Sequence, residues 1–152
     1  MRFSLFMLMF SLLIQSKLFA AATSTARIHQ KIHPALSIEK VSDMFFPDAF
    51  PGAPAYKIDH AQSETLHNAS FLISGEPGKR INIILPNQKI ALGNGKTRDR
   101  IYVSRFSSNV GSSTYLGKTG ELSLFVGATR EEIPNRLPAG DYSGNFSITV
   151  IY

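Results

Sequence analysis

The sequence contains no cysteine and no tryptophan among its 152 residues. The lack of cysteine excludes disulfide bonds, thiolate zinc sites, iron–sulfur clusters and a cysteine nucleophile. Acidic residues are also few, at 11 against 16 lysines and arginines. A hydrophobic fraction of 43% still indicates a folded chain. The stability of that fold must come from its own apolar core or from a partner chain.

The first 22 residues have the pattern of a secretory signal peptide. Arg2 precedes a largely apolar run from Phe3 to Ile14, and Ala20-Ala21-Ala22 fits an A-x-A cleavage site. The run is shorter than the roughly 20 residues that a membrane span needs. We therefore expect export, with cleavage after Ala20 or Ala22, and no membrane span in the mature chain.

The charge of the mature chain does not indicate a nucleic-acid partner. Without Arg2 and Lys17 the remaining 130 residues carry a net charge of +3. No basic stripe with interleaved aromatic residues is present, as a nucleic-acid surface would require.

The mature chain predicts an all-β fold of about seven strands. Apolar residues alternate over short segments that are separated by Gly, Pro, Asn and Asp. We expect strands at 55–59, 68–74, 80–85, 99–106, 121–127 and 142–152. We expect 107–119 to be a flexible connection, and 129–132 is the one short helix candidate. Short strands in this number favour a two-sheet Greek-key sandwich, with a closed barrel as the alternative.

Residues 23–34 form an N-terminal extension before the sandwich domain, which we place at 35–152. Ala26, Ile28 and Ile32 share one face of an alternating segment, and Gln30 is the polar interruption on that face. Pro34 ends the alternation. The segment is either the first strand of the chain's own sheet or a strand donated to another copy, and the residue chemistry of the two is the same.

Catalytic and metal-binding patterns are missing. His29 and His33 are four residues apart, which on a strand separates them by about 13 Å, too far to share one ion. His60 and His67 lie in a polar stretch typical of a surface loop. Glu131-Glu132 would point to opposite faces of a strand and do not form a two-carboxylate hydrolase site. We expect no enzymatic activity, no metal and no cofactor.

The C-terminal stretch 137–152 has the pattern A-G-x-Y-x-G-x-F-x-[IV]-T-V-x-Y. It resembles the ending of a family of exported bacterial proteins known as domain of unknown function 4402. Four further segments fit that family in the same order, at 35–38, 69–78, 81–86 and 121–129. The family often has Phe-Gly after its second strand, whereas here Phe46 is followed by Pro47. This departure affects the expected backbone path of residues 41–54 and not the expected fold.

The ending is also similar to the last strand of chaperone–usher pilins. These pilins often carry a glycine twelve residues before a near-terminal tyrosine, as do Gly140 and Tyr152 here, although their tyrosine is usually penultimate. The resemblance implies an immunoglobulin-like sandwich that lacks one strand. It also implies a periplasmic chaperone, an outer-membrane usher and a terminal strand that contacts the chaperone, with the residues Gly140, Tyr142, Phe146, Ile148, Val150 and Tyr152.

We therefore expect a subunit of a surface filament (a fimbria) that reaches the cell surface or the exterior through the periplasm. Ala26, Ile28 and Ile32 are the expected donor-strand positions. The alternative is a self-contained secreted binding or adhesion module that uses its loops, with 45–56 as its contact surface. Core packing is the simpler interpretation of Phe45, Phe46 and Phe50.

Overall fold

The computed structural model describes residues 23–152, so the expected signal peptide at 1–22 lies outside the described residues. These residues form nine strands and no helix, which confirms the all-β prediction. Residues 23–36 contain no strand. None of the described residues forms a helix that could cross a membrane. The strands are β1 (Ser37–Ser42), β2 (Tyr56–Lys57), β3 (Ala69–Ser74), β4 (Arg80–Ile84), β5 (Ile90–Leu92), β6 (Ile101–Ser108), β7 (Ser113–Tyr115), β8 (Glu121–Arg130) and β9 (Thr149–Ile151).

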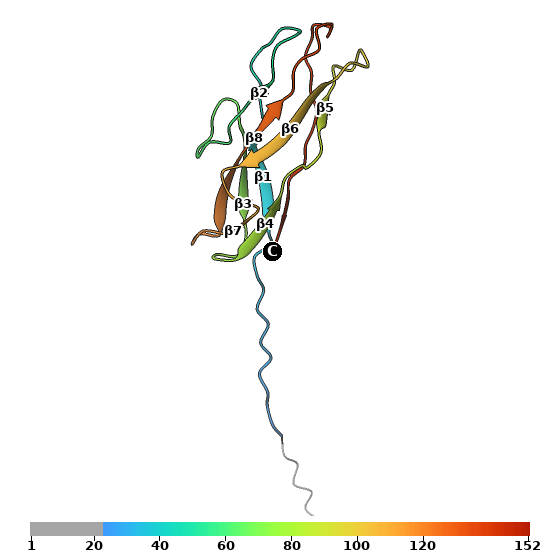
Figure 1. The fold of residues 1–152 in the computed structure, drawn as a ribbon. Helices are drawn as coiled ribbons and strands as arrows, with labels where there is room; N and C mark the ends of the chain where they lie inside the picture. Colours follow the sequence, from blue (N-terminus) through green and yellow to red (C-terminus); the bar gives the residue numbers. More distant parts are fainter. Residues whose placement is uncertain (1–22) are drawn as a thin grey trace, which may run out of the picture. The chain divides into compact units, whose positions relative to one another are not determined.

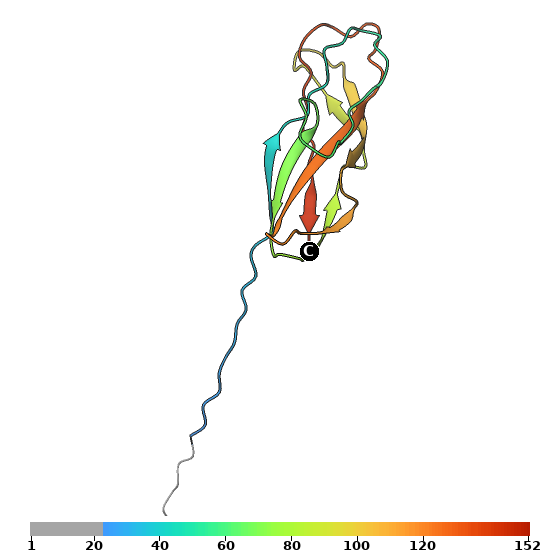
Figure 2. The same ribbon diagram turned by 90° about the vertical axis from the view of Figure 1, so that its left-hand side faces the viewer.

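The strands form two antiparallel sheets of unequal size (Figure 1). The larger sheet has the order β1-β3-β8-β6-β5, with β2 paired to the end of β8, and the smaller one has the order β7-β4-β9. Figure 2 shows β1, in cyan, at one edge of the larger sheet and β9, in red, which is an edge strand of the smaller one. The two sheets agree with the expected β-sandwich.

The core lies between the two sheets and follows the two-residue period of the strands. Ile73 of β3, Leu124 and Val126 of β8, and Ile81 of β4 are fully buried. They pack into one cluster with partly buried residues that include Phe146, Ile148 and Val150 of the C-terminal segment. A second, smaller cluster consists of Ile101, Ile133 and Leu137. The sheets are therefore held together by apolar contacts.

Several elements differ from the sequence prediction. Three strands, β1, β5 and β7, were not among the expected ones, and β7 lies inside the predicted flexible connection at 107–119. The helix candidate at 129–132 is wrong, because β8 continues to Arg130 and pairs there with β2 and β6. The predicted strand at 142–152 is reduced to Thr149–Ile151. Its burial nevertheless alternates, with the even-numbered residues 146, 148 and 150 half-buried. Residues 146–151 therefore have the two-residue period of a strand, but only three of them pair with β4.

We expect Gly127→Ala to lower the free energy of unfolding by about 1–3 kcal/mol, because the new methyl group overpacks the backbone. A Cβ atom at Gly127 would meet the carbonyl oxygen of Ile58 and lie 2.6 Å from the backbone nitrogen of His60. Urea denaturation of the variant measures the loss. Gly111→Ala is the matched control, since its nearest neighbour would be 3.8 Å away. Equal losses in the two variants would contradict this prediction.

Candidate binding groove

A groove of about 950 Å³ opens on one side of the sandwich, where the smaller sheet does not cover the larger one. One wall consists of the end of β1 and the segment that follows it, residues 40–51, and the other wall is the C-terminal segment 137–146. The floor is the inner face of the larger sheet, with Ala69, Phe71, Val103, Phe106 and Arg130 among its residues. The groove is therefore a long, mainly apolar surface between two chain segments.

The C-terminal wall contains three of the residues singled out from the sequence. The ring of Phe146 packs against Phe106 at a centroid distance of 5.1 Å and against Phe71 at 6.2 Å. The hydroxyl of Tyr142 donates a hydrogen bond to the Pro138 carbonyl at 2.9 Å. Gly140 has a φ of 149°, a conformation that favours glycine. The wall is thus held by rings that point toward the core.

The backbone of the opposite wall has one unpaired edge. The Phe45 N–H donates to the His67 carbonyl at 3.0 Å, and the Phe45 carbonyl accepts a hydrogen bond from Nδ1 of His67 at 3.0 Å. Both polar groups of Phe45 therefore point toward the side of β3. In an extended chain the main-chain groups of successive residues point to opposite sides, so we expect those of Met44 on the groove side.

The last strand has a matching free edge. The Ile83 N–H donates to the Ser112 carbonyl, so the polar groups of Ile83 point toward β7 and not toward β9. Ile83 and Val150 are directly opposite in the register of β4 and β9, and they form a pair without mutual hydrogen bonds. The N–H and C=O of Val150 therefore point away from β4. Within the described residues β9 pairs only with β4, and β1 pairs only with β3.

Arg130 lines the floor of the groove and is only 6% exposed. Its Nη2 donates to the Pro54 carbonyl at 2.8 Å, whereas Nε and Nη1 are buried without an acceptor. Burial lowers the pKa of Arg130 from its usual value. A buried donor without a partner costs about 1–3 kcal/mol, and more when it is charged. Nothing in the sequence motifs marked this residue, because its burial depends on the extension of β8.

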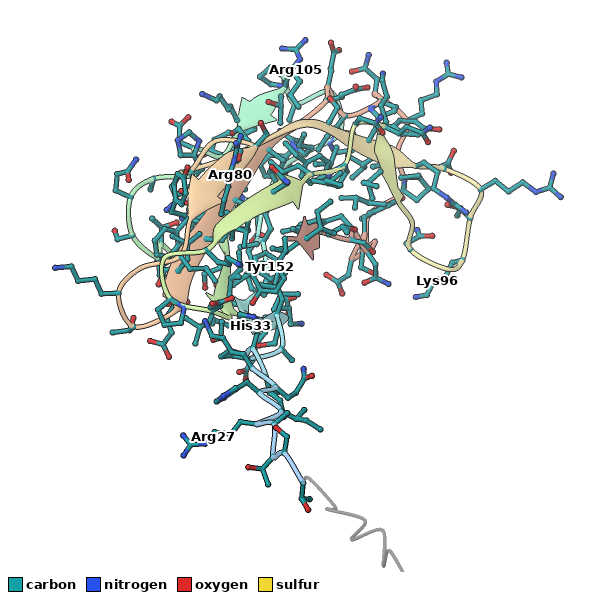
Figure 3. The ribbon with its side chains drawn as sticks, turned by 90° about the horizontal axis from the view of Figure 1, so that it is seen from below. Arg27, His33, Arg80, Lys96, Arg105 and Tyr152 are labelled. Atoms are coloured by element: carbon teal, nitrogen blue, oxygen red, sulfur yellow. The ribbon has the colours of Figure 1, made fainter. Side chains whose placement is uncertain are left out.

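The side chain of Tyr152 links three chain segments at the end of the domain where β1 begins and β9 ends. Its hydroxyl accepts a hydrogen bond from the Glu76 N–H at 2.9 Å and donates one to the Pro34 carbonyl at 3.2 Å. Glu76 also pairs with Nδ1 of His33 at 2.7 Å. Figure 3 shows His33 and Tyr152 at this end of the domain. We call this set the basal junction; it joins the chain before β1 to the chain after β9.

The expected donor positions carry large apolar surfaces in contact with water. Ile28 is 97% exposed and Ile32 is 87% exposed. Ala26 is exposed as well. Isolated exposed apolar side chains are common, but two isoleucines on one face of an alternating segment form an apolar strip that Gln30 interrupts.

Core packing is the wrong interpretation for two of the three phenylalanines near the first wall. Phe45 is 59% exposed and Phe50 is 85% exposed, while Phe46 is half-buried. Pro47 and Pro51 remove backbone donors on this segment, so it leaves the sheet and its aromatic residues lie along the groove.

The histidines make structural contacts. His60 Nδ1 lies 3.2 Å from the Ser107 hydroxyl, and His67 Nδ1 bonds the Phe45 carbonyl. Among residues 23–152 no three His, Asp or Glu side chains are grouped so that they could hold a metal ion.

Removing the Tyr152 hydroxyl should loosen the basal junction. We expect Tyr152→Phe to lower the free energy of unfolding by about 1–2 kcal/mol, since two hydrogen bonds are lost. Tyr115→Phe is the control, because Tyr115 is 65% exposed and its hydroxyl makes no hydrogen bond in the described structure. Denaturation curves of the two variants, compared with the wild type, check this prediction. Coincident curves for all three proteins would show that the junction contributes nothing.

The comparisons with known proteins identify one family. A search of curated proteins gave no match for this chain. A family model described as "Domain of unknown function (DUF4402)" matches residues 56–152, which include β2 to β9 and the C-terminal wall of the groove. The match covers more than half of the chain, and the chain belongs to the DUF4402 family.

Proposed function

We propose that this protein is a structural subunit of a surface filament and that residues 23–33 of one copy fill the groove of the next copy. The observation that carries the proposal is a groove between the segment that follows β1 and the C-terminal segment that leads to β9, in a chain with a strandless N-terminal segment of alternating residues. A strand added to an exposed edge gains main-chain hydrogen bonds, and its alternate side chains fill pockets.

The backbone of the groove supports this proposal. The main-chain groups of Val150 point away from β4, and the chain that leads to Val150 forms the C-terminal wall of the groove. In our proposal an inserted strand pairs along this edge and along the segment at Met44. Unpaired edges beside apolar surface promote aggregation, and native proteins cover them. An inserted strand would cover both edges and the apolar floor at once.

The side chains are complementary as well. Ala26, Ile28 and Ile32 can face the apolar floor, and burial of one isoleucine contributes roughly 1.5–3 kcal/mol. The other face carries Arg27 and Lys31, and the segment 23–33 has no acidic residue. Asp48 and Asp141 line the groove, are exposed and make no ion pair in the described structure. Opposite charges along the rim favour this occupant over an acidic one.

The remaining features of the proposal follow from the resemblance to pilins. The fold would be an immunoglobulin-like Greek-key sandwich completed by the inserted strand. The signal peptide would direct export, a periplasmic chaperone would occupy the groove first, and an outer-membrane usher would assemble the filament at the cell surface. The contact between copies is head-to-tail, so it gives an open filament and not a closed ring.

A self-contained binding module is the second candidate. Phe45 and Phe50 favour it, because exposed aromatic residues on a loop are typical of a contact surface. Such a module is monomeric and complete without residues 23–33. The oligomeric state of the mature chain therefore distinguishes the two candidates.

Replacing both donor isoleucines with aspartate should abolish assembly. In the mature chain, 23–152, we expect Ile28→Asp with Ile32→Asp to reduce multimers at least about a hundredfold, because each carboxylate would have to enter an apolar site. Size-exclusion chromatography with light scattering measures the multimers. The matched control is Thr25→Asp with His29→Asp, which changes the other face and leaves Arg27 and Lys31 in place. Normal multimers in the isoleucine variant would contradict the donor assignment, and a wild-type chain that stays monomeric at high concentration would favour the binding module.

The same variant offers an intact groove without a functional donor. A peptide of residues 23–34 should bind it and stabilise it by about 2.7 kcal/mol at a hundred times the dissociation constant. Thermal unfolding with increasing peptide measures this shift. A peptide with the two aspartates is the control. If the melting temperature does not respond to the wild-type peptide, the groove does not accept this segment.

A further inference from the structure

Two apolar rows in this chain are each interrupted by one polar residue. The inner face of β8 continues from Leu124 through Val126 and Ala128 to Arg130, and all four side chains are buried. The apolar face of the N-terminal segment runs through Ala26 and Ile28 to Ile32, with Gln30 between the two isoleucines. Neither polar residue fits its row unless it finds a partner.

Arg130 offers the donors that such a partner would use. Its Nη2 is satisfied by the Pro54 carbonyl, while Nε and Nη1 have no acceptor. The side chain lines the groove floor and is more than nine-tenths buried. No carboxylate contributes to the shift in its pKa, since burial is the only cause. The site therefore has a positive charge and two nitrogen atoms, with three N–H groups between them, that have no acceptor.

Along the chain, Arg130 stands between residues of two apolar clusters, and both clusters contribute side chains to the groove lining. Ala69 and Phe71 of the main cluster line the groove, and Ile133, which follows Arg130 in the chain, lines it from the second cluster. The groove thus offers an apolar, a polar and again an apolar region. Ile28, Gln30 and Ile32 repeat this order, with the two isoleucines about 13 Å apart in an extended strand.

We infer that Gln30 of the inserted copy binds Arg130 of the accepting copy, with the carboxamide oxygen of Gln30 accepting from the free N–H groups of the guanidinium. This inference rests on the proposed function. Gln30 is the only residue on the apolar face of 26–32 with an acceptor in its side chain. The contact fixes the register of insertion, because a slip of two residues would place an isoleucine against the buried charge.

The contact predicts that the effect of Gln30→Leu on multimer dissociation changes sign with the residue at position 130 of the accepting copy. In the mature chain, Gln30→Leu should make multimers dissociate about tenfold faster, because Arg130 loses its acceptor. In the Arg130→Met background the same substitution should slow dissociation, because two apolar groups now meet. Dissociation rates in guanidinium chloride, followed by size-exclusion chromatography, measure both effects. His29→Leu is the control, since it adds apolar surface on the opposite face.

A charge series at position 30 tests the contact without any change in the folded domain. We expect Gln30→Glu to slow dissociation and Gln30→Lys to accelerate it, because a carboxylate pairs with the guanidinium and an ammonium group repels it. The same substitutions at His29 should not follow this order, because that face is turned away from Arg130. This series remains decisive if Arg130→Met fails to fold.

The outcomes separate this inference from the proposed function. Stable multimers combined with the same effect of Gln30→Leu in both backgrounds would overturn the Gln30–Arg130 contact and leave strand insertion intact. The same holds if Glu and Lys at position 30 behave alike. A wild-type chain that forms no multimers would overturn both the contact and the filament.

Discussion

The unequal width of the two sheets is the constraint on which the rest of the structure depends. Five strands of the larger sheet lie side by side, while the smaller sheet has three. An apolar sheet face is stable only when another layer covers it, and three short strands cannot cover the whole face. The uncovered part becomes the groove floor, and the segments at its margins keep one edge unpaired. The groove, the free edges and the exposed phenylalanines thus have one common cause.

The same constraint explains why strand patterns and observed strands disagree at the margins. Residues 142–152 alternate in sequence and in burial, but a strand exists only where a neighbour supplies hydrogen bonds, and β4 does so for three residues. The segment after β1 also lacks a full set of hydrogen-bonding neighbours, because Pro47 and Pro51 have no backbone N–H that a neighbouring strand could bond. Both segments alternate in burial like strands, but each lacks a neighbouring strand along part of its length.

The sequence predicted the central strands well and the margins poorly. Strands β3, β4, β6 and most of β8 carry their own alternation, so the buried face could be assigned before the structure. Strands β5 and β7 contain three residues each, too few to show a period, and their positions depend on the neighbours β6 and β4. Of the site, Phe146 and Val150 were predictable from their period. Arg130 was not, because only the three-dimensional course of β8 shows that its side chain is buried.

A purely apolar groove would bind an alternating strand tightly but would not determine its register. Isoleucines two or four residues apart can exchange places with little change in buried area, so a slipped insertion would cost little. A buried guanidinium with unmet donors changes this balance, since it is costly beside any apolar residue and tolerable only beside an acceptor. In the proposed complex, Arg130 therefore makes the empty domain less stable and restricts the inserted strand to one register. The unpaired guanidinium destabilises the empty domain, and in our proposal only Gln30 in the correct register supplies its acceptor, so this polar contact contributes specificity and not affinity.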